Sequence, residues 1–316
     1  MFKFLPIDVL SYPYRLIWPI PQSIGMTKQM NSVDKILPER LFKSIVTRPP
    51  YFALTNISFD KYNNILTANV MREQPLGDEV GPISTSEAGR HLALAGLSHI
   101  ALNKKTVNYY LVERAVVNRS KFIGNDKKLK IISKISDVND RKAKAKVRLT
   151  SLSGITIYEF FISYFIISEK VFKRKHRDQK IAPISLHQKN PYKNCTIKTV
   201  TVDEKDQCLK SKLLPFTEED CLGHYPEFSF IPVAILMQAL FSEASKVLKI
   251  HLRGAFKCRL LDAEMTAKQL IPANSSAELS TKIITAHKSN FTIESTVDCG
   301  KTNFAVAVCH LEILRS

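Results

Sequence analysis

The stretch from Pro232 to about Lys249 constrains the fold more than any other part of this chain. It begins PVAILMQALF, in which Gln238 is the only side chain that needs hydrogen bonds. A helix that is apolar on all sides is stable only where other elements enclose it. With 316 residues, the chain is long enough to build such an enclosure. We therefore expect this helix at the centre of a domain, with Gln238 and nearby His224 needing polar partners or a function.

The order of elements around this helix occurs twice, which indicates an internal repeat. A second helix is predicted over 81–103, where Ser84 and Glu87 have the spacing of a capping box. Segments rich in β-branched and aromatic residues flank each helix and predict strands. In the first half they are YFALTNISF, NILTANVMR, VNYYLVERAVVNR, KLKIISKIS, AKVRLTSL and TIYEFFISYFIIS, the last two joined by an SG turn. In the second half they are CTIKTVTVD, CLKSKLL, AFKCRLLDAEM, AELSTKIITAHK, FTIESTVDC and FAVAVCHLEIL.

Each half therefore predicts one antiparallel sheet wrapped around its own helix. We expect the two sheets to join edge to edge, because this pairs edge strands whose backbone groups would otherwise be exposed. Between the halves lies the basic segment KVFKRKHRDQK, which we expect to be a solvated linker.

The net charge of +17 favours an acidic partner, although dispersed lysines also keep a surface solvated without one. Nucleic acid has little support as that partner, because no RNA-recognition signature, zinc finger or base-reading helix accompanies the charge. The six cysteines form no C-x-x-C pair, which favours reduced thiols in a cytoplasmic protein over disulfides or a metal site. The apolar N-terminus is interrupted at Pro6, Asp8 and Pro13, so we expect no stable membrane insertion.

The stretch HYPEFSFIPVAILMQA resembles the loop–helix signature H-F-P-G-H-P-x-M-P-G-x-x-x-x-[ED]-A of the hotdog dehydratases of fatty-acid synthesis. His224, Pro226, Pro232 and Ala239 match it in register, and the following strands are similar to the family's next two. The resemblance covers most of 195–314, whereas in the first half it rests on the order of elements and on the entry GPIS. It implies an α+β double hotdog fold. The expected domains are an N-terminal lead-in packing on the body (1–50), an N-terminal hotdog (51–169), a basic linker (170–194) and a C-terminal hotdog (195–316).

The chain also departs from this signature. Glu227, Phe228 and Val233 replace the family's glycine, histidine and second glycine, and Gln238 stands at the position of its catalytic acid. An amide cannot hold and release a proton at neutral pH. In the family the histidine and the acid come from two different hotdogs, so a double hotdog has two pockets.

Aligning the two helices places His91 opposite Gln238 and Gly77 opposite His224. The pocket that pairs the first half's loop with Gln238 then has neither histidine nor acid. Only the pocket that combines His224 with the first helix has chemical groups suited to catalysis. In that helix Glu87, Arg90 and His91 occupy one turn.

The resemblance implies roles for these residues. His224 would remove the α-proton of a 3-hydroxyacyl thioester, unless it is a loop histidine bonded to a nearby carbonyl. Glu87 or His91 would protonate the departing hydroxyl or orient a water, although Glu87 also fits a purely capping role. The remaining candidates are substrate-binding residues: Arg90, Gln238, and the start of the second helix at Pro232, Val233 and Ala234, whose amides could polarise a carbonyl. Gln238 also fits a core amide.

The resemblance favours a 3-hydroxyacyl dehydratase with no resident cofactor, whose substrate arrives on the phosphopantetheine of acyl carrier protein or on coenzyme A. The alternatives are a hotdog thioesterase, in which Glu87 or His91 activates water, and a non-catalytic acyl-binding subunit. Acidic carrier protein would suit the basic chain. Its candidate contacts are Arg114, Arg119, Lys121 and Lys170–Lys175. A monomer and a homodimer are both compatible with the sequence.

Overall fold

The computed structural model describes residues 33–182, 190–193, 197–205, 207–300 and 302–314, and the following statements concern these residues. The predicted packing of the N-terminal lead-in lies, for residues 1–32, outside them. No helix in the described part of the chain combines the length and apolar character required to cross a membrane.

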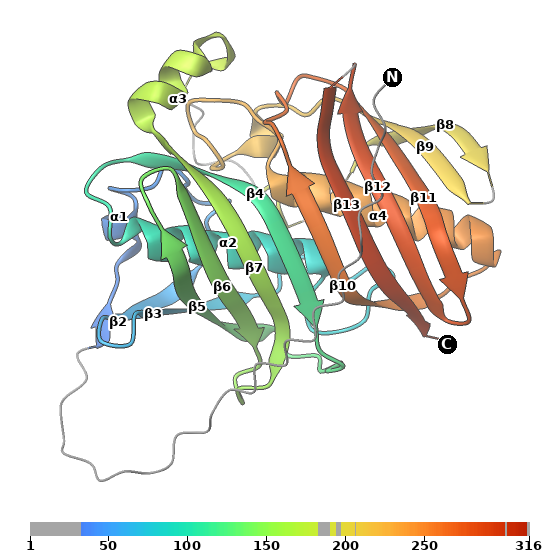
Figure 1. The fold of residues 1–316 in the computed structure, drawn as a ribbon, viewed down its shortest axis with the longest axis horizontal. Helices are drawn as coiled ribbons and strands as arrows, with labels where there is room; N and C mark the ends of the chain where they lie inside the picture. The colour runs from blue at the N-terminus through green and yellow to red at the C-terminus, as the bar shows by residue number, and fades with distance from the viewer. Residues whose placement is uncertain (1–32, 183–189, 194–196, 206, 301, 315–316) are drawn as a thin grey trace, which may run out of the picture. The chain divides into compact units, whose positions relative to one another are not determined.

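Thirteen strands of the described residues form one sheet, in the order β1-β2-β3-β5-β6-β7-β4-β10-β13-β12-β11-β9-β8 (Figure 1). The strands of the first half are β1 Val33–Lys35, β2 Thr55–Asp60, β3 Ile65–Met71, β4 Asn108–Arg119, β5 Lys128–Val138, β6 Lys142–Thr150 and β7 Thr156–Ser168. Those of the second half are β8 Thr199–Lys205, β9 Cys208–Leu213, β10 Lys257–Ala267, β11 Ala277–His287, β12 Asn290–Cys299 and β13 Thr302–Leu314. Every neighbouring pair is antiparallel.

The two halves of the sheet join where β4 pairs with β10, from Asn118 opposite Asp262 to Arg114 opposite Thr266. This confirms the predicted edge-to-edge junction. It leaves β1 and β8 as the outermost strands, because β4 and β10 each satisfy the other's backbone groups.

Two long helices pack on the sheet, one in each half. Helix α2 spans Thr85–Ala101 and contacts β3, β5, β6 and β7, and helix α4 spans Val233–Leu252 and contacts β9, β11 and β12 (Figure 1). All residues of α2 except Ala93 are buried, although polar side chains make up a larger share of α2 than of α4. In α4, by contrast, residues such as Ser242 and Ser245 are half-exposed. The prediction of a helix buried on all sides therefore describes α2 better than α4.

The helices meet where Gly89 of α2 faces Met237 of α4. A β-carbon on Gly89 would lie 2.8 Å from the Met237 methyl carbon, so only glycine gives this methionine its space. At the start of α2, the Ser84 hydroxyl accepts a hydrogen bond from the Glu87 amide at 3.3 Å, as the capping box predicts. The Glu87 carboxylate does not return to Ser84. It accepts from the amides of Glu73 and Gln74 instead.

The basic segment after β7 differs from a solvated linker. It contains helix α3 (Glu169–Lys175), in which Phe172 is fully buried and stacks on Tyr109 with ring centroids 3.7 Å apart. Tyr192, at the other end of the segment, is also buried. Lys170, Lys175 and Lys180 are exposed as expected, but Lys173 is half-buried. The two rings bind the segment to the body because their apolar surface is removed from water. The remaining short helices are α1 Pro38–Leu41, η1 Arg177–Gln179 and η2 Glu219–Cys221.

Candidate active site

An apolar cavity lies between the two halves. Its walls come from α2, α4, β7 and β10 and include Leu94, Leu97, Met237, Phe160, Ile162 and Met265. Tyr51, Arg90, His224 and the start of α4 at Val233 and Ala234 supply polar groups to the same cavity. The cavity therefore joins His224 to the first helix, as the sequence predicts.

The loop that carries His224 is held against the segment before β2. Gly223 has φ +81°, and its carbonyl accepts a hydrogen bond from the Arg48 amide at 2.7 Å. A β-carbon at residue 223 would collide with the Arg48 carbonyl oxygen, so this position requires glycine for both its conformation and its space. The contact brings the rings of His224 and Tyr51 to 5.0 Å between centroids.

His224 is buried, and its ring stacks on Tyr225 with centroids 4.0 Å apart. Burial lowers the pKa of His224 to about 3, against the effect of a hydrogen bond between the ring and the Phe230 backbone. The ring is therefore neutral at physiological pH. Its Nδ1 atom has no hydrogen-bond partner among the described residues. With its proton on Nε2, the neutral ring has a lone pair on Nδ1 that can accept a proton.

Tyr51 places a phenol at the N-terminus of α4. Its hydroxyl lies close to the backbone amide of Ala234, which favours the ionised form of the phenol. Burial raises the pKa of Tyr51 to about 12, which outweighs the opposing effects of nearby Arg90 and of this amide. The phenol therefore stays protonated and can donate its own hydrogen bond. The sequence analysis missed Tyr51, because it lies about 170 residues before the signature and was assigned to a predicted strand.

Arg90 supplies a buried guanidinium to the cavity. It forms an ion pair with Glu73 and lies over the ring of Tyr192, 5.2 Å from its centroid. The Nε and Nη1 atoms of Arg90 have no hydrogen-bond partner among the described residues. Buried N–H groups of this kind are normally paired, so the site has donor capacity left for a ligand or a water.

The structure corrects the helix alignment by one residue. Measured from Thr85, where α2 begins, and from Val233, where α4 begins, Arg90 and Gln238 occupy the same position. Arg90 thus stands at the family's acid position in the first helix, and His91 does not. The same offset places Leu76 rather than Gly77 opposite His224. His91 and Glu87 are not among the residues that line the apolar cavity.

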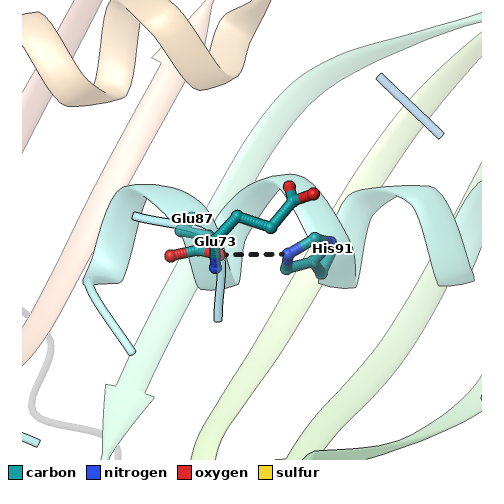
Figure 2. A group of neighbouring side chains, drawn as sticks. All are labelled: Glu73, Glu87 and His91. Carbon is teal, nitrogen blue, oxygen red and sulfur yellow. Dashed lines mark hydrogen bonds and ion pairs between the residues drawn. The ribbon is translucent and has the colours of Figure 1, made fainter. Parts of the chain in front are cut away.

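Glu73, Glu87 and His91 form a cluster of neighbouring side chains beside α2 (Figure 2). His91 Nε2 lies 3.6 Å from a Glu87 oxygen, and the potential metal-binding atoms of the three residues lie within 4.8 Å of one another. Arg90 is bonded to Glu73 and lies 3.4 Å from His91 Nε2, so it already supplies a cation to this cluster. Burial lowers the pKa of His91. The cluster fastens the loop after β3 to α2, and a metal ion would have to displace Arg90.

Gln238 lies away from the apolar cavity, in the wall of a groove of about 1000 Å³ between α4 and residues 74–79. The helix alignment predicted no acid here, but the groove contains Asp78 and Glu79. Glu79 accepts hydrogen bonds from the Thr85 amide at 3.0 Å and hydroxyl at 2.6 Å, and Asp78 pairs with Lys249 at 2.7 Å. The carboxylate of Glu79 therefore lies at the N-terminus of α2, whereas the phenol of Tyr51 lies at the N-terminus of α4.

The proposed carrier-protein contacts fall into different environments. Arg119 is buried, donates to the Val80 carbonyl and lies 4.0 Å from Glu79, so it is not available for a partner. Arg114 is exposed but pairs with Glu264 at 2.7 Å. Within 170–175, Lys173 pairs with Glu169 and with Glu227.

No protein-family model and no curated protein matches this chain. Its structure is similar to an acyl-CoA thioesterase II, TesB2, of Mycobacterium marinum (TM-score 0.51, 10% identity, 82% of this chain and 95% of that one). It is also similar to the 12:0-ACP thioesterase of Umbellularia californica (0.54, 9%, 84% and 100%). A third similar structure is a hot dog fold protein of unknown function from Alicyclobacillus acidocaldarius (0.54, 10%, 85% and 99%). At these identities the comparisons show the fold, which is that of hotdog proteins.

Proposed function

We propose that this chain is a double hotdog that hydrolyses acyl thioesters in one pocket between its halves. The observation that carries the proposal is the end of the apolar cavity, where His224, Tyr51 and Arg90 meet the N-terminus of α4. An apolar cavity suits an acyl chain, and a few converging polar groups at its end suit the thioester. The similarity in fold to thioesterases supports hydrolysis as the reaction.

The thioester carbonyl would lie at the start of α4. Tyr51 lies close to the Ala234 amide, so its O–H would donate to the carbonyl oxygen there, and the positive end of the helix dipole would add to the stabilisation of an oxyanion. At the N-terminus of α2 the Glu79 carboxylate would repel the same charge. This difference between a phenol and a carboxylate supports one active pocket rather than two.

His224 would act as the general base. Its neutral Nδ1 takes a proton from water as the water oxygen bonds to the carbonyl carbon. When the carbon–sulfur bond breaks, the same proton passes to the leaving thiolate. The products are a free fatty acid and a free thiol, on the phosphopantetheine arm of acyl carrier protein or on coenzyme A. We propose further that the protein acts in the cytoplasm, as a monomer or a homodimer, on substrates carried by acyl carrier protein or coenzyme A. The reaction requires neither nucleic acid nor a resident cofactor.

Dehydration of a 3-hydroxyacyl thioester is the second candidate, and the signature around His224 favours it. That reaction needs an acid at the helix position held by Gln238 in α4 and by Arg90 in α2. None of the described residues that line the apolar cavity is a carboxylic acid. Hydrolysis requires no such acid, because one histidine can accept a proton from water and return it to the thiolate.

The test is to incubate the protein with saturated acyl-coenzyme A, 3-hydroxyacyl-coenzyme A and the matching acyl carrier proteins. Free thiol and enoyl absorbance are followed in parallel for wild type, His224→Ala and the control His287→Asn, whose side chain is exposed. We expect thiol release from saturated substrates, lost only in His224→Ala. Enoyl product without thiol would identify a dehydratase. Acyl binding without either product would identify an acyl-binding protein.

A further inference from the structure

A small polar cavity lies between the apolar cavity and the open groove. Its polar wall consists of Gln74, Ser86, Glu87, Arg90, Tyr192 and Gln238. It shares Arg90 and Ala234 with the apolar cavity. It shares Gln74, Ser86 and Gln238 with the groove. The three spaces therefore follow one another across the α2–α4 contact.

The two outer spaces open at different places. The apolar cavity reaches the surface at the exposed residues Lys268 and Gln269. The groove opens to solvent beside Lys246 and Lys249, whose side chains are 40% and 50% exposed. A ligand that fills the apolar cavity thus leaves the groove open.

The chemistry of the small cavity suits water. Arg90 contributes buried N–H donors at Nε and Nη1 that have no partner among the described residues. Glu87 contributes a carboxylate, and Gln238 contributes an amide that both donates and accepts. The space in it that is open to the centre of a water molecule is about 10 Å³, which is the lower limit for holding one water. An acyl chain would find few apolar partners there.

We propose that the groove and the small polar cavity deliver the water that hydrolyses the thioester. This inference rests on the proposed function. A bound acyl chain and the carrier arm would fill the apolar cavity and its opening, whose walls hold water poorly. Water from the groove would pass Gln238, bind to Arg90 and reach the junction at Ala234, close to Tyr51. There its oxygen attacks the carbonyl carbon and His224 takes its proton.

Gln238 is a positioning residue on this route, and it separates the groove from the small cavity. The sequence resemblance places it at a catalytic acid position. In the structure its amide forms part of both polar walls. A polar side chain here keeps water in the passage, whereas an apolar side chain of similar size would close it.

The experiment compares wild type with Gln238→Leu and with Ser86→Val, which narrows the passage from α2. His251→Leu is the control, since it is also a polar-to-apolar change on α4 and His251 lines none of the three spaces. In the two passage variants we expect the kcat for thiol release to fall tenfold or more. KM, the affinity for a free fatty acid, and the melting temperature should change little, because the apolar cavity is untouched.

The outcomes separate the route from the reaction. If wild type releases no thiol from any substrate, the proposed function fails. If wild type is active and folded Gln238→Leu keeps its kcat, the route is wrong and the proposed function stands. A high-resolution crystal structure of wild type supplies a readout without turnover. An ordered water between Arg90, Glu87 and Gln238 is expected, and a dry cavity would overturn the inference.

Discussion

Met237 divides the apolar space of this protein into two cavities, and its removal should lengthen the acyl chain that binds. Together with Ala115 and Met265, it lines both the apolar cavity described above and a second, smaller apolar cavity. The absence of a β-carbon on Gly89 of α2 leaves the space that the Met237 methyl group occupies. The substitution Met237→Ala should therefore join the two cavities.

The magnitude follows from apolar burial. Each further buried methylene contributes about 0.8 kcal/mol, which is about fourfold in affinity. A chain longer by two carbons should thus bind Met237→Ala about fifteenfold more tightly relative to wild type. The empty variant should lose about 2–5 kcal/mol of unfolding free energy, because the truncation leaves a cavity. Part of that loss should return when a long chain binds.

The assay is displacement of a fluorescent fatty acid by saturated fatty acids of increasing length, which needs no turnover. Wild-type affinity should reach a plateau at a chain length that increases by about two to four carbons in Met237→Ala, at about fourfold per methylene. Gly89→Ala should lower the chain length at which the plateau is reached, since the new β-carbon displaces Met237 into the cavities. Met71→Ala, at a 54% exposed position, is the matched control. An unchanged plateau in folded Met237→Ala would refute the reasoning.

Three further predictions concern the loop and its neighbours. Because the unfolded state protonates His224 before the folded state does, stability should fall by up to about 1.4 kcal/mol per pH unit as pH decreases from about 6.5 toward 3. Denaturant titrations of wild type and His224→Asn should show a smaller slope in the variant. Burial also lowers the pKa of His99 to about 4, and this residue contributes equally to the pH dependence of stability in wild type and in His224→Asn. Tyr51→Phe should lower the kcat for thiol release by about 10²–10³ with fatty-acid affinity retained, and equal loss of both would argue against its role as a donor. Gly223→Ala should cost at least about 1–3 kcal/mol in a denaturant melt, because of its φ of +81° and its contact with the Arg48 carbonyl; near-wild-type stability would contradict this.

Much of the fold could be predicted because its signals are local. β-Branched and aromatic residues marked the strands, and Ser84 marked the start of α2 through a hydrogen bond within one turn. The edge-to-edge joining of the two sheets followed from the general need to pair edge strands, but the identity of the two strands that meet, β4 and β10, did not. Phe172 and Tyr192 show the limit of such signals, because a segment with a basic composition still contains two rings that fill gaps elsewhere in the fold.

The candidate site was predictable only in part. His224 was found through its motif and does line the cavity, but its partners were assigned from an alignment that was wrong by one residue. One residue along a helix rotates a side chain by about 100°, which is enough to exchange Arg90 for His91 at the cavity wall. Spacing alone could not set that rotation, because the start of each helix depends on its cap and on its packing.

The sequence by itself determined where most of the strands and the two long helices lie, and that a histidine precedes the second helix. These properties depend on neighbours within a few residues, where hydrophobic periodicity and capping act. Only the tertiary structure decided that Tyr51 lies at the start of α4, that Arg90 faces the cavity, and that Gln238 lies between two polar spaces. Such contacts join residues far apart in the chain. Their geometry depends on how two helices and a sheet pack together, which no local pattern encodes.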